Sequence, residues 1–274
     1  MTVSKKSKLL SNKLSYGFCN VSIAALRKSP SHTSEMVSQL LFGEHFIVTD
    51  SHSDDTWVRI RNAFDNYDGW IHKKQFQNIS RSTYLKINKS DLILATEMQS
   101  ALIFESDKKV IPLLPGAHLP FFEDGKLAIE KNKFIFKGKV FRSDTSPNRK
   151  KIIQTALDFL HAPYLWGGRS EFGIDCSGFS QLVYKVNGIK IPRDAYQQAA
   201  LGKELDFLEE ALPGDLAFFD NEQGKITHVG IILSENEIIH ASGTVHVDGN
   251  DLKGIYCRET GAYSHHLRSV RRYI

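Results

Sequence analysis

The segment that decides the fold covers residues 173–188 and reads GIDCSGFSQLVYKVNG. Four of its apolar residues recur at the spacing of one helical face: Phe179, Leu182, Val183 and Val186. Asp175 or Ser177 is suited to cap the first turn, and Gly188 suits the left-handed conformation that often follows a helix. The segment therefore predicts a helix whose first turn carries Cys176.

The patterns on either side of this segment predict an α+β domain. Upstream, apolar residues between positions 152 and 160 follow helical spacing, and Pro163 stops the helix. Downstream lie three short runs typical of strands, at residues 216–219, 229–233 and 238–240. Because helices precede an antiparallel sheet, we expect an α+β fold over residues 147–274.

The remaining N-terminal part of the chain is typical of small β-barrels. Brief apolar runs at 21–26, 36–42, 46–48 and 57–60 are separated by turn-forming residues, and Asp68-Gly69 suits a tight hairpin turn. We expect one β-barrel over residues 1–79 and a second, degenerate β unit over residues 80–146. The polar stretch at 142–149 is the expected linker to the last domain.

The composition excludes several classes of protein. The 274 residues include 35 Lys+Arg and 31 Asp+Glu, and this net charge of +4 is too small to indicate nucleic-acid binding. Three cysteines do not form a disulfide framework, which indicates a reducing compartment. No apolar run reaches about 18 residues, and none forms the core of a signal peptide. We therefore expect a soluble, monomeric protein of the cytoplasm that does not bind membranes.

Cys176 is the first candidate for catalysis. At the first turn of a helix, unpaired N–H groups and the positive end of the helix dipole favour a thiolate. Free cysteines are more commonly small buried apolar residues. The neighbouring glycines at 173 and 178 indicate an accessible turn instead, so we interpret Cys176 as a reactive thiol.

Two histidines are placed to serve this thiol as a base. If residues 234–237 turn the chain, the flanking strands pair antiparallel and bring His228 and His240 together. One imidazole would then accept the thiol proton while the other fixes its tautomer. Each histidine taken alone is more commonly a surface residue or a hydrogen-bonded core residue.

Other chemistries receive less support from the sequence. One cysteine and two histidines could hold zinc, but paired C-x-x-C or H-E-x-x-H spacing is absent. The G-x-S-x-G motif of serine hydrolases is absent as well. We therefore expect neither a metal nor a cofactor.

Six motifs in order carry a specific resemblance: Pro163-Tyr-Leu-Trp-Gly-Gly168, Asp175-Cys-Ser-Gly-Phe179, Pro192-Arg-Asp194, Leu212-Pro-Gly-Asp-Leu216, His228-Val-Gly-Ile231 and Ile239-His-Ala-Ser242. In this order they resemble the NlpC family of bacterial cell-wall cysteine peptidases. The resemblance implies a papain-like catalytic domain preceded by one or two SH3-like β-barrels. The front half resembles the branch that cleaves γ-D-glutamyl to diamino-acid bonds in murein stem peptides.

The resemblance also implies roles for residues of the last domain. Cys176 would be the nucleophile, His228 the general base and His240 the residue that orients it. Tyr164 matches the family tyrosine near the oxyanion, although a core aromatic residue is an equal alternative. Trp166 resembles the tryptophan that lines the substrate groove, or it packs beside its two glycines.

The relatives in this branch act on peptides with a free N-terminal L-Ala, whose ammonium requires a carboxylate. Asp175, Ser177 and Asp194 match the family positions around that amine. From the SH3-like unit we expect Glu35 and Tyr67 to close the cleft, although Glu35 could be an ordinary surface residue and Tyr67 a turn residue.

We therefore expect a cysteine endopeptidase that acts on L-Ala-γ-D-Glu-diamino-acid peptides, in the recycling of murein peptides. Two alternatives stay open. The first is a cell-wall-binding protein without catalysis, and the second is a Cys–His amidase or acyltransferase with another substrate.

Overall fold

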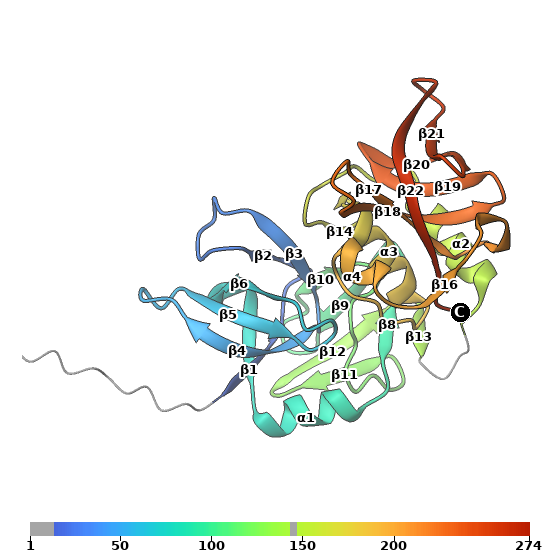
Figure 1. Cartoon of the computed structure of the whole chain (residues 1–274). Helices are drawn as coiled ribbons and strands as arrows, with labels where there is room; N and C mark the ends of the chain where they lie inside the picture. Colours follow the sequence, from blue (N-terminus) through green and yellow to red (C-terminus); the bar gives the residue numbers. More distant parts are fainter. Residues whose placement is uncertain (1–13, 143–146) are drawn as a thin grey trace, which may run out of the picture.

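The computed structural model describes residues 14–142 and 147–274, which form a β-rich N-terminal half and an α+β C-terminal half (Figure 1). The start of the chain and residues 143–146 of the predicted linker lie outside the described residues. Within the described ranges, none of the helices is both long and apolar enough to cross a membrane.

Seven strands of the N-terminal half form one antiparallel sheet in the order β3-β2-β6-β5-β4-β1-β7. They are β1 (Ser15–Cys19), β2 (Ile23–Arg27), β3 (Met36–Leu41), β4 (His45–Ser51), β5 (Trp57–Asn62), β6 (Asp68–His72) and β7 (Phe76–Ile79), with the 3-10 turn η1 (Lys73–Gln75) before β7. The predicted turn at Asp68-Gly69 is wrong, because both residues pair within β6. The chain turns just before them, where Asn66 adopts a φ of 59°.

A second β unit follows, and a helix that was not predicted leads into it. Helix α1 (Arg81–Lys89) is capped by Ser80, whose hydroxyl accepts from the Thr83 amide at 3.1 Å. Its only buried residue is Ile87, so the apolar period that marks a helix in sequence is missing. The strands are β8 (Ile93–Ala95), β9 (Ser100–Phe104), β10 (Val110–Leu113), β11 (Lys126–Ile129), β12 (Asn132–Lys137) and β13 (Val140–Arg142).

One hydrophobic cluster spans the two β units, beside a second cluster that lies within the first unit alone. Strands β9 to β12 form a sheet in the order β10-β9-β12-β11, and β13 pairs with β8. Tyr16, Phe18 and Phe42 of the first unit pack in the same cluster as Phe134 and Phe136 of the second. The N-terminal half is therefore joined through its interior as well as along the chain.

The C-terminal half places helices against a long antiparallel sheet. Its elements are α2 (Arg149–Leu157), β14 (Arg169–Ser170), β15 (Gly173–Ile174), α3 (Cys176–Val186), α4 (Ala195–Ala199), β16 (Lys203–Leu205), η2 (Leu208–Glu210), β17 (Leu216–Asp220), β18 (Ile226–Ser234), β19 (Glu237–Ser242), β20 (Thr244–Asp251), β21 (Gly254–Cys257) and β22 (Ala262–Arg272). The sheet order is β16-β22-β17-β18-β19-β20-β21, and β21 also pairs with β22, which closes the sheet on itself. The α+β fold is confirmed.

Helix α3 forms as predicted. The Asp175 carboxylate caps its start by accepting from the Gly178 amide at 2.6 Å, and Gly188 follows its end with a φ of 79°. Every residue of α3 is buried, because the helix packs against β18 and β19 on one side and contacts the N-terminal half on the other. This burial fixes the direction in which Cys176 emerges.

A buried ion cluster holds the two halves together. Glu44, in the turn between β3 and β4, accepts from Arg169 Nη1 and Nη2 at 3.0 Å each and from Lys185 Nζ at 2.5 Å. All three side chains are at most 2% exposed. Burial opposes the ionisation of Glu44, but the charges of Arg169 and Lys185 outweigh it and lower its pKa to about 2. The N-terminal half thus supplies the counter-ion for two cations of the C-terminal half.

Candidate active site

A cleft of about 400 Å³ opens where the two halves meet. All the predicted site residues except the two histidines line it: Glu35, Tyr67, Tyr164, Trp166, Asp175, Cys176, Ser177 and Asp194. His228 and His240 are buried in the neighbouring sheet. Residues far apart in the chain, such as Glu35 and Asp194 at a separation of 159 positions, therefore share one cleft.

Cys176 opens α3 and meets the backbone of β18 on both sides of His228. Its Sγ lies 4.0 Å from the Thr227 carbonyl oxygen and faces the Val229 amide. Within the described residues, Sγ is not hydrogen-bonded to the imidazole of His228. The sulfur is therefore beside the base but has to approach it for proton transfer.

The expected thiolate at Cys176 is not confirmed. Burial raises the pKa of the thiol to about 12, and the charge of Asp175 acts in the same direction. Asp175 caps the helix and so places a negative charge at the end whose positive dipole was expected to favour the thiolate. The nucleophile must therefore be generated by transfer of its proton to a base.

The two histidines form the pair that the hairpin was expected to create. Strands β18 and β19 pair antiparallel with Gly230 opposite His240, so His228 lies on the diagonal from His240. His228 Nε2 is 2.9 Å from His240 Nδ1. Burial, together with the nearby His265 ring at 4.0 Å, lowers the pKa of His228 well below its usual value. His228 is therefore neutral in the resting protein and able to accept a proton.

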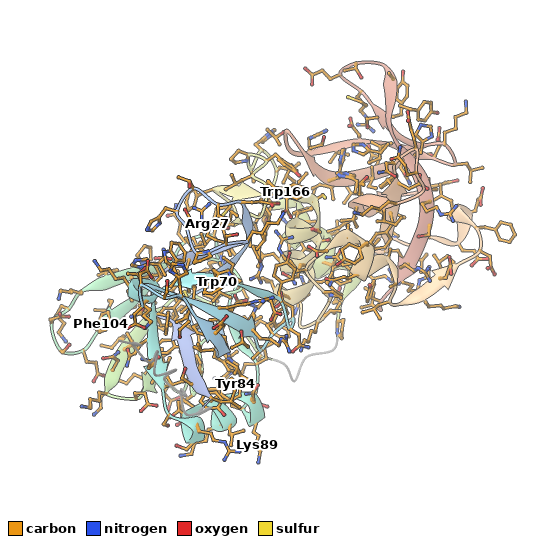
Figure 2. All side chains as sticks on the ribbon, turned by 60° about the vertical axis from the view of Figure 1, so that its left-hand side comes forward. Arg27, Trp70, Tyr84, Lys89, Phe104 and Trp166 are labelled. Carbon is orange, nitrogen blue, oxygen red and sulfur yellow. The ribbon has the colours of Figure 1, made fainter. Side chains whose placement is uncertain are left out.

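Tyr164 and Trp166 both line the cleft but differ in their exposure to solvent. Tyr164 is half-buried, and burial raises the pKa of its phenol to about 12, which keeps the hydroxyl protonated as a donor. Trp166 is 61% exposed at the junction of the halves (Figure 2), where its Nε1 donates to Glu35 Oε1 at 2.9 Å. Gly167 behind it has a φ of 77°, and a Cβ there would lie 2.4 Å from the Met36 carbonyl oxygen. This close approach requires glycine and brings the indole onto the SH3-like unit.

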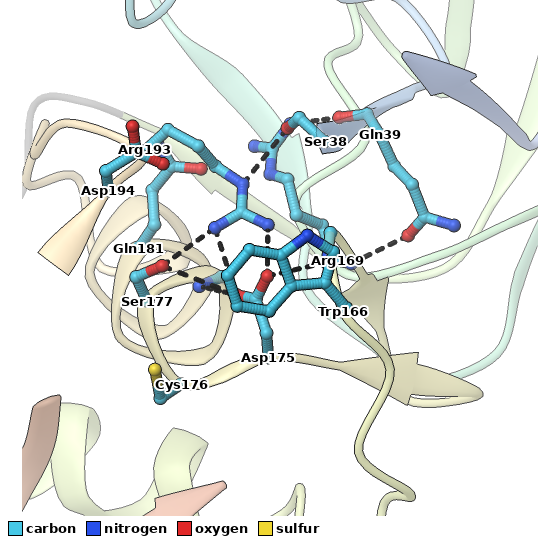
Figure 3. A network of polar contacts seen from close by, with 12 residues as sticks. Ser38, Gln39, Trp166, Arg169, Asp175, Cys176, Ser177, Gln181, Arg193 and Asp194 are labelled. Carbon is cyan, nitrogen blue, oxygen red and sulfur yellow. Dashed lines mark hydrogen bonds and ion pairs between the residues drawn. The ribbon is translucent and has the colours of Figure 1, made fainter. Parts of the chain in front are cut away.

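Asp175 is the centre of a buried network that includes Arg193 (Figure 3). Arg193 Nη1 and Nη2 donate to its two carboxylate oxygens at 2.9 and 2.6 Å, and the Gly167 amide donates to Oδ2 at 2.8 Å. Arg193 also reaches the Ser177 hydroxyl at 2.9 Å and the Ser38 hydroxyl at 3.1 Å. The carboxylate is already bound on both oxygens, so its predicted contact with a substrate amine stays a prediction.

Arg193 was missed as a site residue although it stands inside a quoted motif, Pro192-Arg-Asp194. Its neighbour Asp194 accepts a hydrogen bond from the Tyr67 hydroxyl at 3.3 Å. Burial raises the pKa of Asp194, partly offset by the charge of Arg193. Glu35 is more exposed, and hydrogen bonds from Lys28 and Trp166 lower its pKa. Carboxylates from both halves therefore line the cleft.

A set of metal-type donors lies behind the histidine pair. One ring nitrogen each of His240 and His246 and an oxygen of Asp248 lie within 4.8 Å of one another. The carboxylate oxygen is 3.3 Å from His240 and 3.1 Å from His246, which are hydrogen-bond distances. Asp248 and His246 were also missed, because nothing in their sequence spacing relates them to His240.

Comparisons with known proteins agree with this geometry. Residues 161–265 match the NlpC/P60 family, and residues 26–76 match the bacterial dipeptidyl-peptidase Sh3 domain. A gamma-D-glutamyl-L-lysine dipeptidyl-peptidase of Bacillus subtilis (strain 168) is 32% identical over 250 residues, covering 86% of this chain and 80% of that protein. The chain belongs to the NlpC/P60 family.

Further similarities of this NlpC/P60 protein extend over both halves. Dipeptidyl-peptidase 6 of Lysinibacillus sphaericus is 25% identical to this chain, and the match covers 80% of this chain and 85% of that protein. The crystal structure of an NlpC/P60 family protein from Bacillus cereus ATCC 10987 superposes with a TM-score of 0.79 at 23% identity, covering 94% of this chain and 99% of that one. The resemblance inferred from the six motifs is confirmed, and so is a cysteine peptidase with an SH3-like unit before its catalytic domain.

Proposed function

We propose that this chain is a cysteine endopeptidase that hydrolyses the γ-D-glutamyl to diamino-acid bond of murein stem peptides with a free N-terminal L-Ala. The observation that carries the proposal is the shared cleft: Glu35 and Tyr67 from the SH3-like unit and Asp194 from the catalytic domain line the cleft that contains Cys176. Carboxylates that line a cleft suit an ammonium group. The names of the relatives from two Bacillus species support the same bond.

The first half-reaction forms a thioester. The thiol of Cys176 transfers its proton to His228 while Sγ attacks the γ-carbonyl carbon of D-glutamate. The Cys176 backbone N–H and the protonated hydroxyl of Tyr164 serve as donors to the oxyanion. When the C–N bond breaks, His228 gives its proton to the departing amino group of the diamino acid.

The second half-reaction restores the enzyme. His228 accepts a proton from a water molecule as its oxygen attacks the thioester carbonyl. The C–S bond then breaks, His228 returns the proton to Sγ, and the dipeptide L-Ala-γ-D-Glu leaves with a new carboxylate. Cys176 and His228 thus serve both steps, and His240 orients His228 throughout.

The test compares the tripeptide L-Ala-γ-D-Glu-L-Lys with its N-acetyl derivative, with products quantified by mass spectrometry. We expect kcat/KM for the acetylated peptide to be lower by about 100-fold, because the half-buried Asp194 and the more exposed Glu35 would lose their charged partner. Glu35→Gln should lower kcat/KM for the free peptide roughly fivefold, as for a partly exposed ion pair.

The matched control is Glu237→Gln, which removes an exposed carboxylate that pairs with Arg258 and does not line the cleft. This substitution should leave the ratio of kcat/KM for the free peptide to kcat/KM for the acetylated peptide unchanged. Equal cleavage of both peptides by the natural chain would contradict recognition of the amine. Cleavage of neither would instead favour Cys–His chemistry on another acyl substrate.

The same proposal places the enzyme in the cytoplasm, where imported murein peptides would be recycled. A free amine at L-Ala supports this location, because the intact wall carries its glycan at that nitrogen, and a cleft of about 400 Å³ suits a short peptide. Recovery of the protein from the exported fraction of its native cells would contradict the location.

A further inference from the structure

We propose that Asp248 is a positioning residue of the peptidase, which sets the tautomer of His240 and, through His240, that of the base His228. The inference rests on the activity proposed above. Asp248 lies on β20 opposite Ile238 of β19, on the diagonal from His240, and it is 3% exposed. The buried chain of contacts therefore runs from β18 through β19 to β20.

The carboxylate of Asp248 is held ionised. Burial opposes its charge, but hydrogen bonds from His240 and from the Arg258 backbone N–H outweigh burial and lower its pKa to about 2. The Arg258 amide donates to Oδ1 at 3.0 Å, while Oδ2 faces His240 Nε2 at 3.3 Å and His246 Nε2 at 3.1 Å. An ionised carboxylate only accepts hydrogen bonds.

This acceptor decides where the protons of both histidines lie. Because Asp248 accepts, His240 carries its proton on Nε2. Burial lowers the pKa of His240, so the ring is neutral and its Nδ1 is an acceptor. His228 Nε2, at 2.9 Å from that atom, must then be the donor. The remaining nitrogen of His228, Nδ1, keeps its lone pair for the thiol proton.

The same carboxylate stabilises the base once it is protonated. The titratable groups near the His228–His240 pair come from α3, β20 and β22: Cys176, His246, Asp248 and His265. Among these, Asp248 alone is an anion at neutral pH. Removal of its charge should therefore disfavour the imidazolium form of the pair.

The experiment measures kcat, KM and the pH profile of Asp248→Asn on the free tripeptide. We expect kcat to fall about 100-fold with little change in KM. The side-chain amide of asparagine can donate to His240, and this would reverse the direction of the hydrogen bonds from position 248 through His240 to His228. The acidic limb of the pH profile should move to lower pH, because this limb reports protonation of the neutral base His228 and loss of the Asp248 charge lowers the pKa of that base. The control is Glu237→Gln, which removes an exposed carboxylate from β19, the strand that carries His240, and should keep kcat within about threefold.

A second measurement does not depend on substrate or on the stability of a variant. In the natural chain without substrate, nitrogen NMR shifts should show His240 protonated on Nε2 and His228 protonated on Nε2. The opposite tautomers, or an unchanged kcat in Asp248→Asn, would overturn the role of Asp248. Failure of the natural chain to cleave the tripeptide would instead contradict the proposed function and leave the NMR result to decide on Asp248.

The same three side chains are also donors suited to a metal ion. Dialysis against a chelator followed by assay separates the two roles. A hydrogen-bonded chain should keep its activity after this treatment. Activity that is lost on chelation and restored by zinc would show that these three side chains bind a metal ion, and it would overturn the positioning role of Asp248.

Discussion

Replacement of Cys176 by alanine is expected to lower kcat for the tripeptide by at least about 10⁴-fold, as removal of a nucleophile does in other hydrolases. The sulfur is the nucleophile that forms the acyl intermediate, and no other sulfur lines the cleft within the described residues. Steady-state assays with purified protein would measure the loss. Because the alanine methyl fits the buried position, the variant should remain folded.

The matched control for this experiment is Cys257→Ser. Cys257 is a free cysteine at the end of β21, partly exposed and outside the cleft. Its replacement should leave kcat within about twofold. Activity of Cys176→Ala close to that of the natural chain would contradict covalent catalysis by this cysteine. Absence of activity in both chains would instead favour a non-catalytic binding protein.

Replacement of Glu44 by glutamine should lower the free energy of unfolding by about 3–5 kcal/mol at neutral pH. The substitution keeps the shape of the side chain but leaves Arg169 and Lys185 buried without a counter-ion. Urea denaturation followed by circular dichroism would measure the change. Glu237→Gln breaks a solvent-exposed pair and should cost less than about 1 kcal/mol.

The cost of Glu44→Gln should depend on pH in a defined direction. The pKa of Glu44 is lowered from 4.5 to about 2 in the folded protein, so its stabilisation is present above pH 4.5 and is lost as the pH falls towards 2. The difference between the two chains should therefore shrink over this interval. A difference that is constant between pH 7 and pH 2 would show that the carboxylate charge does not stabilise the interface.

The parts of the fold that depend on local pattern were predictable. Helix α3 could be predicted because a capping residue, an apolar face and a terminal glycine all occur within 16 consecutive residues. The pairing of His228 with His240 followed from a short turn between two apolar runs. Glu35 and Tyr67 were found by resemblance, since nothing local distinguishes them from surface residues.

The parts that depend on long-range contacts were not predictable. Arg193 matters because it binds an aspartate on another element, and Asp248 because two strands pair in one register. The pKa of Cys176 could not be read from its place at a helix end, because burial and the capping Asp175 outweigh the dipole. Helix α1 was missed because eight of its nine residues are not buried.

The common interior of the two β units has a consequence for how such chains are assembled in evolution. Phe42 of the first unit meets Phe134 of the second edge-on, with ring centroids 5.9 Å apart. A gene fusion that exchanged only the first unit would have to match these aromatic shapes, residue for residue, or leave a void. The two units are therefore expected to be inherited as a single block.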